Sequence, residues 1–213
     1  MPVFCRGDKI IHFIHIPKTG GASVRELLYD NGWNNIEKEK HSPRDVWQTY
    51  EKNWEYQFCV TRNPYDRIES GYFHVRRAGA ESVMSFLVSP SSFLEFVRLV
   101  VDNMSKEVWS IDEDNNFWRP QVDFIDGDTA IFQLEEIDNL LLELKKRKYI
   151  SQDSVMPHYR HRSRVSHDIN APPGIDISFR DAWNYDHNIV HDSFVRFYKE
   201  DFEKFKYDIK RYE

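Results

Sequence analysis

The sequence has few cysteines and no long apolar run. Cys5 and Cys59 are the only cysteines among 213 residues, which excludes a small secreted scaffold held by disulfides. No run of about 18 apolar residues occurs, so we expect no transmembrane helix. Residues 1–8 contain no basic stretch followed by an apolar core. We therefore expect no secretory signal and a cytoplasmic protein.

An excess of positive charge is also absent. The formal net charge is -6 at pH 7, which argues against a nucleic-acid binder. Hydrophobic residues make up 40% of the chain and aromatic residues 15%, which excludes a disordered protein. This length and composition predict one globular domain over residues 1–213. The sequence indicates no particular oligomeric state.

An apolar run near the amino end leads into a loop that contains glycine. Residues 8–16 predict a strand buried on both faces, and residues 24–31 predict a helix. A glycine loop between a strand and a helix directs backbone N–H groups at an anion. Lys18 adds a mobile positive charge, and Thr19 and Ser23 add hydroxyl donors. We therefore predict a site for phosphate, or for a group of that shape, made by Pro17, Lys18, Thr19, Gly20, Gly21, Ala22 and Ser23.

A second strand is followed by a second candidate anion site. Residues 56–61 predict a short apolar strand, and Asn63 and Pro64 mark the start of the next helix. Arg62 would then stand at the carboxyl end of the strand, where ligands bind in open α/β sheets. Its planar fork of donors suits a phosphate, and Ser70 adds a hydroxyl about two turns into the helix. The strand could be a neighbour of the first one.

Strands and helices alternate along much of the chain. After the two strand–helix units, residues 129–134 predict a third strand, and residues 135–148 predict a helix that is acidic at its start and basic at its end. This alternation predicts an α/β fold with a central parallel sheet flanked by helices. Residues 149–177 lack periodicity and are typical of a functional loop. Residues 178–207 predict further helix, whose aromatic residues we expect in the core.

The two anion motifs, in this order, resemble those of the sulfotransferases that use 3′-phosphoadenosine 5′-phosphosulfate (PAPS). The loop at residues 17–23 resembles the family's 5′-phosphosulfate loop, and residues 62–70 resemble its 3′-phosphate motif. The residue pattern is similar to the carbohydrate, Golgi-type branch, which includes the heparan sulfate O-sulfotransferases, although this chain is short. The resemblance implies a P-loop-like three-layer fold. It continues at Pro120-Gln121, at residues 132–135 and at residues 198–203.

The resemblance also implies roles for particular residues. PAPS would be the sulfuryl donor, no metal would take part, and the acceptor would be a hydroxyl on a carbohydrate or small molecule. Lys18 and the loop would hold the 5′-phosphosulfate, while Arg62 and Ser70 would hold the 3′-phosphate. The loop at residues 149–177 would cover the nucleotide through Tyr159, Arg160 and Arg162, by stacking on adenine or by reaching the 3′-phosphate.

A sulfuryl transfer needs a base for the acceptor hydroxyl, and two histidines are candidates. His41 lies in the connection between the two strand–helix units, beside the predicted start of a helix. A nearby helix amino end favours the neutral imidazole, which can accept a proton. His15, three residues before Lys18, is the second candidate, although a histidine in a strand can instead point into the core.

Two other functions fit parts of this pattern. A nucleotide-dependent kinase is disfavoured, because Lys18 precedes the glycines instead of following them as in a Walker A loop. A non-catalytic module that binds nucleotides or sulfated ligands is a further alternative. The presence of both Lys18 and His41 argues against such a module.

Overall fold

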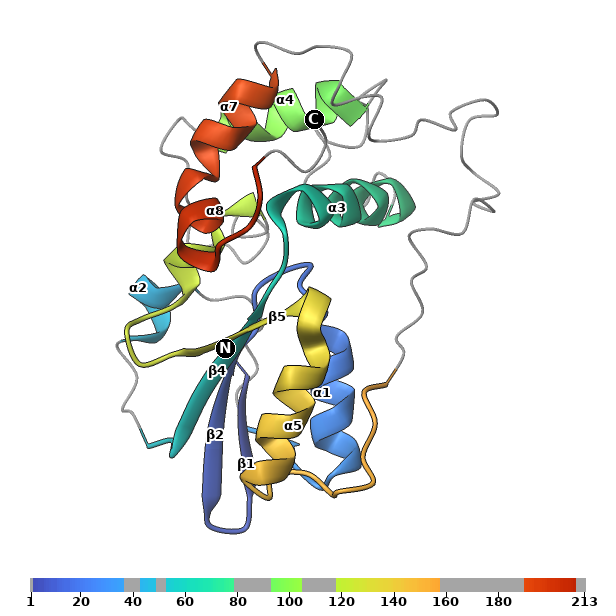
Figure 1. The fold of residues 1–213 in the computed structure, drawn as a ribbon, viewed down its shortest axis with the longest axis vertical. Coiled ribbons are helices and arrows are strands. Elements are labelled where there is room, and N and C mark those ends of the chain that lie inside the picture. The colour runs from blue at the N-terminus through green and yellow to red at the C-terminus, as the bar shows by residue number, and fades with distance from the viewer. Residues whose placement is uncertain are drawn as a thin grey trace. The chain divides into compact units, whose positions relative to one another are not determined.

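A mixed sheet forms the centre of the strand-containing part of the molecule (Figure 1). The computed structural model describes residues 2–36, 43–48, 53–78, 93–104, 118–157 and 190–209. The central three strands, β2, β4 and β5, are parallel to one another, whereas β1 runs antiparallel to both of its neighbours. In spatial order the strands are β3 (Asn34–Asn35), β1 (Val3–Arg6), β2 (Lys9–Ile14), β4 (Tyr56–Thr61) and β5 (Ala130–Gln133).

The α/β class predicted from the sequence is confirmed, and its three predicted strands are present. The antiparallel strand β1 is an addition to the predicted parallel sheet. Gly7, at a φ of 59°, allows the chain to reverse between β1 and β2, because glycine adopts this left-handed conformation without a steric cost. The resulting hairpin pairs Val3 with His12, so the amino end of β1 lies next to the carboxyl half of β2.

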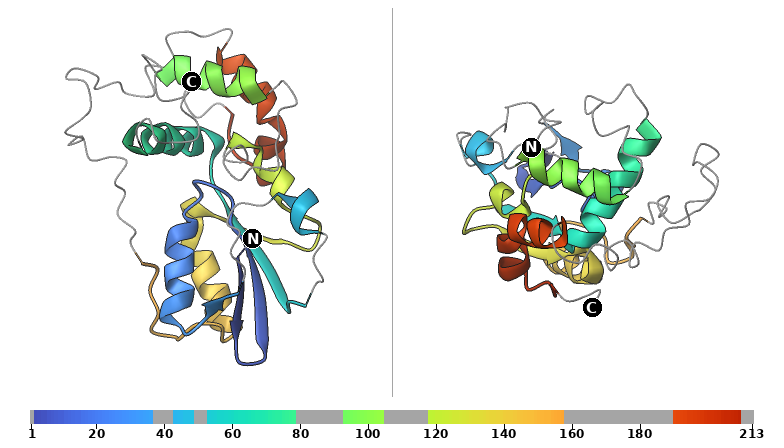
Figure 2. Two further views of the ribbon diagram at one scale, coloured as in Figure 1. Left: turned by 180° about the vertical axis from the view of Figure 1, so that it is seen from behind. Right: turned by 90° about the horizontal axis from the view of Figure 1, so that it is seen from above.

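Helices α1 (Gly21–Asp30) and α5 (Ile137–Lys146) lie side by side over one face of the sheet (Figure 1), and Figure 2 shows the pair from behind. Alternate residues of the strands meet the apolar faces of both helices, as the two-residue period of a strand requires. The predicted helices after β2 and β5 are therefore confirmed. The core under the helices includes Ile11, Phe13, Val24, Leu27, Leu28, Phe58, Val60, Leu140 and Leu144.

Arg6 joins the carboxyl ends of α1 and α5. Its guanidinium donates hydrogen bonds to the backbone carbonyls of Asn31, Lys148 and Tyr149 at 2.9–3.0 Å. It also lies 4.7 Å from the centre of the Trp33 ring. The last backbone carbonyls of a helix receive no hydrogen bond from within the helix. A cation at this end donates hydrogen bonds to them and also interacts favourably with the negative end of the helix dipole. This contact fixes the two helices together at the end opposite the predicted anion loop.

The chain divides into two compact units, which we name the sheet unit and the helical unit. The sheet unit comprises Met1–Arg62 and Gln121–Tyr159, and the helical unit comprises Asn63–Pro120 and Arg160–Glu213. The sheet unit also contains α2 (Arg44–Trp47), η4 (Gln121–Phe124) and η5 (Leu134–Glu136). Pro43 is the N-cap of α2. Residues 49–52 lie outside the described residues.

The helical unit has an aromatic core of its own. Its helices are α3 (Pro64–Ala78), α4 (Phe93–Met104), α7 (Val190–Phe197) and α8 (Lys199–Phe205), and α4 packs against α7 (Figure 2). The predicted burial of the aromatic residues in the last helices is confirmed for Phe194, Tyr198, Phe202 and Phe205. Tyr198 donates to the backbone carbonyl of Trp118 at 2.6 Å, and burial raises the pKa of the Tyr198 hydroxyl.

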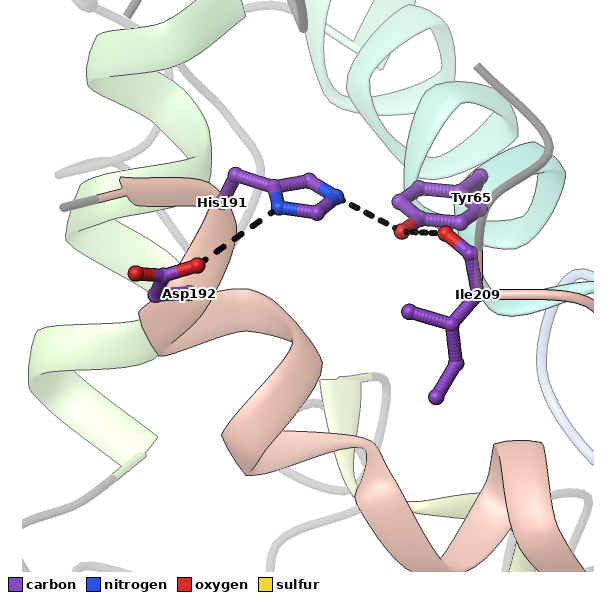
Figure 3. Close-up of polar contacts among 4 residues, drawn as sticks. All are labelled: Tyr65, His191, Asp192 and Ile209. Carbon is purple, nitrogen blue, oxygen red and sulfur yellow. Dashed lines mark hydrogen bonds and ion pairs between the residues drawn. The ribbon is translucent and has the colours of Figure 1, made fainter. Parts of the chain in front are cut away.

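Tyr65, in the first turn of α3, holds the carboxyl-terminal segment in place (Figure 3). Its hydroxyl donates to the backbone carbonyl of Ile209 at 2.8 Å. The single hydroxyl proton is used there, so the ring Nε2 of His191, also 2.8 Å away, is the donor in the second bond. The Nδ1 of His191 lies 3.9 Å from the carboxylate of Asp192. The tyrosine of the predicted 3′-phosphate motif therefore has a structural role.

Among the described residues, no helix combines the length and the hydropathy that a membrane span requires.

Candidate active site

The two predicted anion motifs follow neighbouring parallel strands. Ile14 of β2 lies opposite Cys59 of β4 in the register, so both strands end at the same edge of the sheet. The loop after β2 and Arg62 after β4 therefore leave the sheet side by side. The prediction that these strands are neighbours is confirmed. In open α/β sheets this is the edge at which ligands bind.

The loop after β2 has an unusual backbone. Lys18 has a φ of 67° and Gly20 a φ of 85°. A non-glycine residue in the left-handed region costs energy and occurs mainly at functional sites and turns. The hydroxyl of Thr19 is fully buried and donates to the backbone carbonyl of Ile16 at 2.9 Å. This bond stabilises the turn and uses the hydroxyl proton, so the backbone N–H is what Thr19 has left for a ligand.

The amino end of α1 is arranged to receive an anion. The carbonyl of Gly20 accepts from the N–H groups of Ser23 and Val24 at 3.0 and 3.4 Å. By contrast, the N–H groups of Thr19 and Gly20 form no hydrogen bond with any residue in the described part of the chain. The first turn of α1 contains no acidic residue that would compete with a ligand. Unsatisfied N–H groups and the positive end of the helix dipole both attract negative charge here.

Both loop glycines are required by close packing. A Cβ on Gly20 would lie 2.7 Å from the Cδ1 atom of Leu134. A Cβ on Gly21 would overlap the Nε2 and Cδ2 atoms of His15, whose ring lies against the start of α1. His15 is only 8% exposed and stacks on Phe13. The structure thus places His15 beneath the loop, where its ring supports the first turn of the helix.

Arg62 contacts the loop directly. Its Nη1 donates to the backbone carbonyl of Lys18 at 3.3 Å. The buried side chain of Gln121 brackets the Arg62 backbone: its Oε1 accepts from the Arg62 N–H at 2.9 Å, and its Nε2 donates to the Arg62 carbonyl at 2.8 Å. The amide of Gln121 therefore extends the pairing of β4 by one residue. This pair of bonds fixes the base of the Arg62 side chain beside the loop.

No role was predicted for Gln121. The signal in the sequence was its place in the family-like Pro120-Gln121 pair. Another arginine of the second motif, Arg67, is only 4% exposed and donates to the backbone carbonyl of Arg119 at 2.9 Å. That bond lies within the helical unit and serves its packing.

Five predicted site residues are not placed in this arrangement by the described structure. Ser70 is half-buried on α3 and belongs to the helical unit. His41, Tyr159, Arg160 and Arg162 lie outside the described residues. Their predicted roles stay predictions.

The residues present fit an anionic donor. The sheet unit supplies two cations at the strand edge, Lys18 and Arg62, and the backbone N–H groups of Thr19 and Gly20. In addition, the Nε of Arg25 on α1 is buried and has no hydrogen-bond partner. Within the described residues no group of histidine, cysteine and carboxylate side chains could hold a metal ion. These features make the end of the parallel sheet a candidate anion site, at the edge where ligands bind in open α/β sheets.

A family model agrees with this class of site. The model of the sulfotransferase family matches residues 2–208, nearly the whole chain. The chain therefore belongs to the sulfotransferase family, which supports sulfuryl transfer as its chemistry. The searches of curated proteins and of solved structures found no match.

Proposed function

We propose that this protein transfers a sulfuryl group from PAPS to an acceptor hydroxyl. The observation that supports the proposal is the hydrogen bond from Arg62 to the carbonyl of Lys18, which brings the two predicted anion motifs together where β2 and β4 end. PAPS has anionic groups at both its 5′ and its 3′ positions, so its binding needs two neighbouring sets of hydrogen-bond donors. Membership of the sulfotransferase family supports the reaction class.

In this proposal the loop binds the 5′-phosphosulfate. The N–H groups of Thr19 and Gly20 and the amino end of α1 would face its oxygens. The Nζ of Lys18 would contact the oxygen that bridges phosphorus and sulfur, where negative charge develops as the S–O bond breaks. Arg62 would bind the 3′-phosphate, because its planar guanidinium is a fork of N–H donors that suits a phosphate. Ser70 would add its hydroxyl there.

The transfer itself is an in-line displacement. The acceptor oxygen forms a bond to sulfur while the bond from sulfur to the bridging oxygen breaks, which leaves a sulfate ester and adenosine 3′,5′-bisphosphate. The acceptor proton passes to a base, for which His41 is our first choice. His15 is the second, and its burial against Gly21 fits a supporting role better than direct contact with an acceptor. Tyr159, Arg160 and Arg162 would cover the nucleotide.

The acceptor class rests on resemblance alone. The combined motifs are similar to those of the carbohydrate branch, so we propose a saccharide hydroxyl as the first substrate to test. Incubating the protein with PAPS and a panel of sugars, lipids and phenols, and measuring the gain of one sulfuryl group by mass spectrometry, would identify the acceptor.

Binding of adenosine 3′,5′-bisphosphate tests the donor. At 100 times its Kd a ligand stabilises the folded state by about 2.7 kcal/mol, which is readily seen as a thermal shift. If ATP with Mg²⁺ stabilised the protein and the bisphosphate did not, the kinase alternative would be favoured. Stabilisation by the bisphosphate without sulfation of any acceptor would favour the binding module.

Two substitutions separate the roles within the site. Lys18→Ala should lower turnover strongly and leave part of the bisphosphate affinity, whereas Arg62→Ala should mainly weaken bisphosphate binding. Lys146→Ala is a matched control, because Lys146 is an exposed cation on α5 in the same unit. If Lys18→Ala and Arg62→Ala both behaved like this control, the site assignment would be wrong.

A further inference from the structure

The first residue after each of the three parallel strands contacts the loop that follows β2 or the first turn of α1. His15 follows β2, and its ring lies where a Cβ of Gly21 would be. Arg62 follows β4 and donates to a backbone carbonyl of the loop. Leu134 follows β5, and its Cδ1 would lie 2.7 Å from a Cβ of Gly20. The loop is therefore supported from all three strand ends.

Leu134 has no polar side-chain group, so it acts on this site only by packing. It begins η5 and belongs to the family-like stretch at residues 132–135. Thr61 pairs with Gln133 in the register, so the chain leaves β4 and β5 at the same level of the sheet. The side chain of Leu134 packs against the core under α1 and α5. It thus reaches Gly20 from the face of the sheet that these two helices cover.

The position of Gly20 decides whether the loop can bind an anion. The N–H groups of Gly20 and Thr19 form no hydrogen bond with any described residue, and the carbonyl of Gly20 accepts from the N–H groups of Ser23 and Val24. Gly20 and Lys18 both have a positive φ, and such a backbone persists only where the surrounding structure holds it. A displaced Gly20 would misdirect the N–H donors and release the first turn of α1.

We infer that Leu134 is a positioning residue, which keeps Gly20 in the conformation that presents the loop N–H groups to the 5′-phosphosulfate of the donor. This inference rests on the proposed function and adds a residue outside both anion motifs. Leu134 contacts the loop and not the donor. Without its methyl groups the loop samples other conformations, and the apparent affinity for the donor falls with the fraction of molecules that keep the binding conformation.

The test compares Leu134→Ala with Leu141→Ala by titration calorimetry with adenosine 3′,5′-bisphosphate. Both leucines are partly buried against the same core, so the two variants should lose similar stability in urea unfolding. We expect Leu134→Ala to weaken bisphosphate binding about tenfold, the result of a binding conformation kept by about one molecule in ten. Leu141→Ala should bind within about twofold of wild type. Adenosine 3′-phosphate, which lacks the 5′ group, should bind Leu134→Ala and wild type equally.

Two further variants at this position separate packing from a general loss of stability. Leu134→Met has a similar volume and reach, so it should bind the bisphosphate within about threefold of wild type. Leu134→Val is shorter by one carbon and keeps most of the apolar volume. If Leu134→Ala does not fold, Leu134→Val takes its place against Leu141→Val, with the same expected order of affinities.

Amide hydrogen exchange in the ligand-free protein gives a readout that the matched loss of stability does not reproduce. The N–H groups of Ser23 and Val24 lie 3.0 and 3.4 Å from the carbonyl of Gly20, so they report whether Gly20 keeps its place. They should exchange about tenfold faster in Leu134→Ala than in Leu141→Ala, because only the first variant loosens the loop.

Each contrary result is decisive. Bisphosphate binding by Leu134→Ala within about twofold of that by Leu141→Ala would refute the inference and leave the proposed function intact. An equal loss of affinity for adenosine 3′-phosphate would also refute it, since Leu134 would then act on the Arg62 side of the site. Unchanged exchange at Ser23 and Val24 would overturn it as well. If wild type itself does not bind the bisphosphate, the proposed function fails, and the inference fails with it.

Discussion

Gln121 offers the sharpest test of how the sheet unit positions Arg62. Its side-chain amide accepts from the N–H of Arg62 and donates to the Arg62 carbonyl, at 2.9 and 2.8 Å. The side chain is fully buried, so water does not replace either bond readily. We choose the substitution Gln121→Met, because methionine keeps the unbranched shape and approximate volume of glutamine and removes both bonds.

The expected cost follows from the two backbone groups involved. Leaving a buried donor or acceptor without its hydrogen bond costs about 1–3 kcal/mol for each group. Two groups give about 2–6 kcal/mol at full burial, and backbone relaxation toward water should reduce this to about 2–3 kcal/mol. The Arg62 guanidinium should also lose its fixed base, and we expect an affinity for adenosine 3′,5′-bisphosphate about tenfold weaker.

Urea unfolding followed by tryptophan fluorescence measures the stability, and titration calorimetry measures the binding. Gln152→Met is the matched control, because Gln152 is exposed and makes one long bond of 3.2 Å to the carbonyl of Lys145. We expect the control to lie within about 0.5 kcal/mol of wild type. A Gln121→Met protein with wild-type stability and wild-type bisphosphate affinity would refute the positioning role of Gln121.

Two further predictions concern the loop and the sheet. Gly21→Ala places a Cβ against the ring of His15, so it should destabilise the fold by about 1–3 kcal/mol in urea unfolding, and adding His15→Ala should recover stability. The control is Gly127→Ala, whose Cβ would meet no neighbouring atom and which should leave stability unchanged. Equal stability of the two glycine variants would contradict the packing argument. Burial raises the pKa of Tyr56 from 10.0 to about 12, although the guanidinium of Arg147 over its ring opposes the rise. Because the pKa of Tyr56 is higher in the folded than in the unfolded state, the neutral Tyr56 hydroxyl stabilises the fold. This stabilisation is complete below pH 10 and is lost between pH 10 and about 12. Tyr56→Phe should therefore gain stability relative to wild type as pH rises above 10 in urea titrations, and a constant difference across that range would disprove it.

Much of the fold could be predicted from local patterns. Apolar runs and their flanking residues located β2, β4 and β5. The signal was clear for β4, which is buried along its whole length, because a strand buried on both faces needs a continuous apolar stretch. Asn63 and Pro64 marked the start of α3, where the Asn63 side chain accepts from the N–H of Tyr65 at 3.0 Å. The four-residue strand β1 was missed, since so short a segment carries no period and its pairing depends on the hairpin that follows.

The sequence by itself indicated the sulfotransferase family, which the family model confirms, and it predicted two anion motifs, because loop glycines, a lysine and a strand-end arginine are local features with short spacing. The tertiary structure decided which residues complete the site. Gln121 reaches Arg62 across 59 positions of the chain, and His15 meets Gly21 only because the loop folds back over the strand. Burial and long-range hydrogen bonds arise from packing between distant segments, so no local pattern could have indicated them.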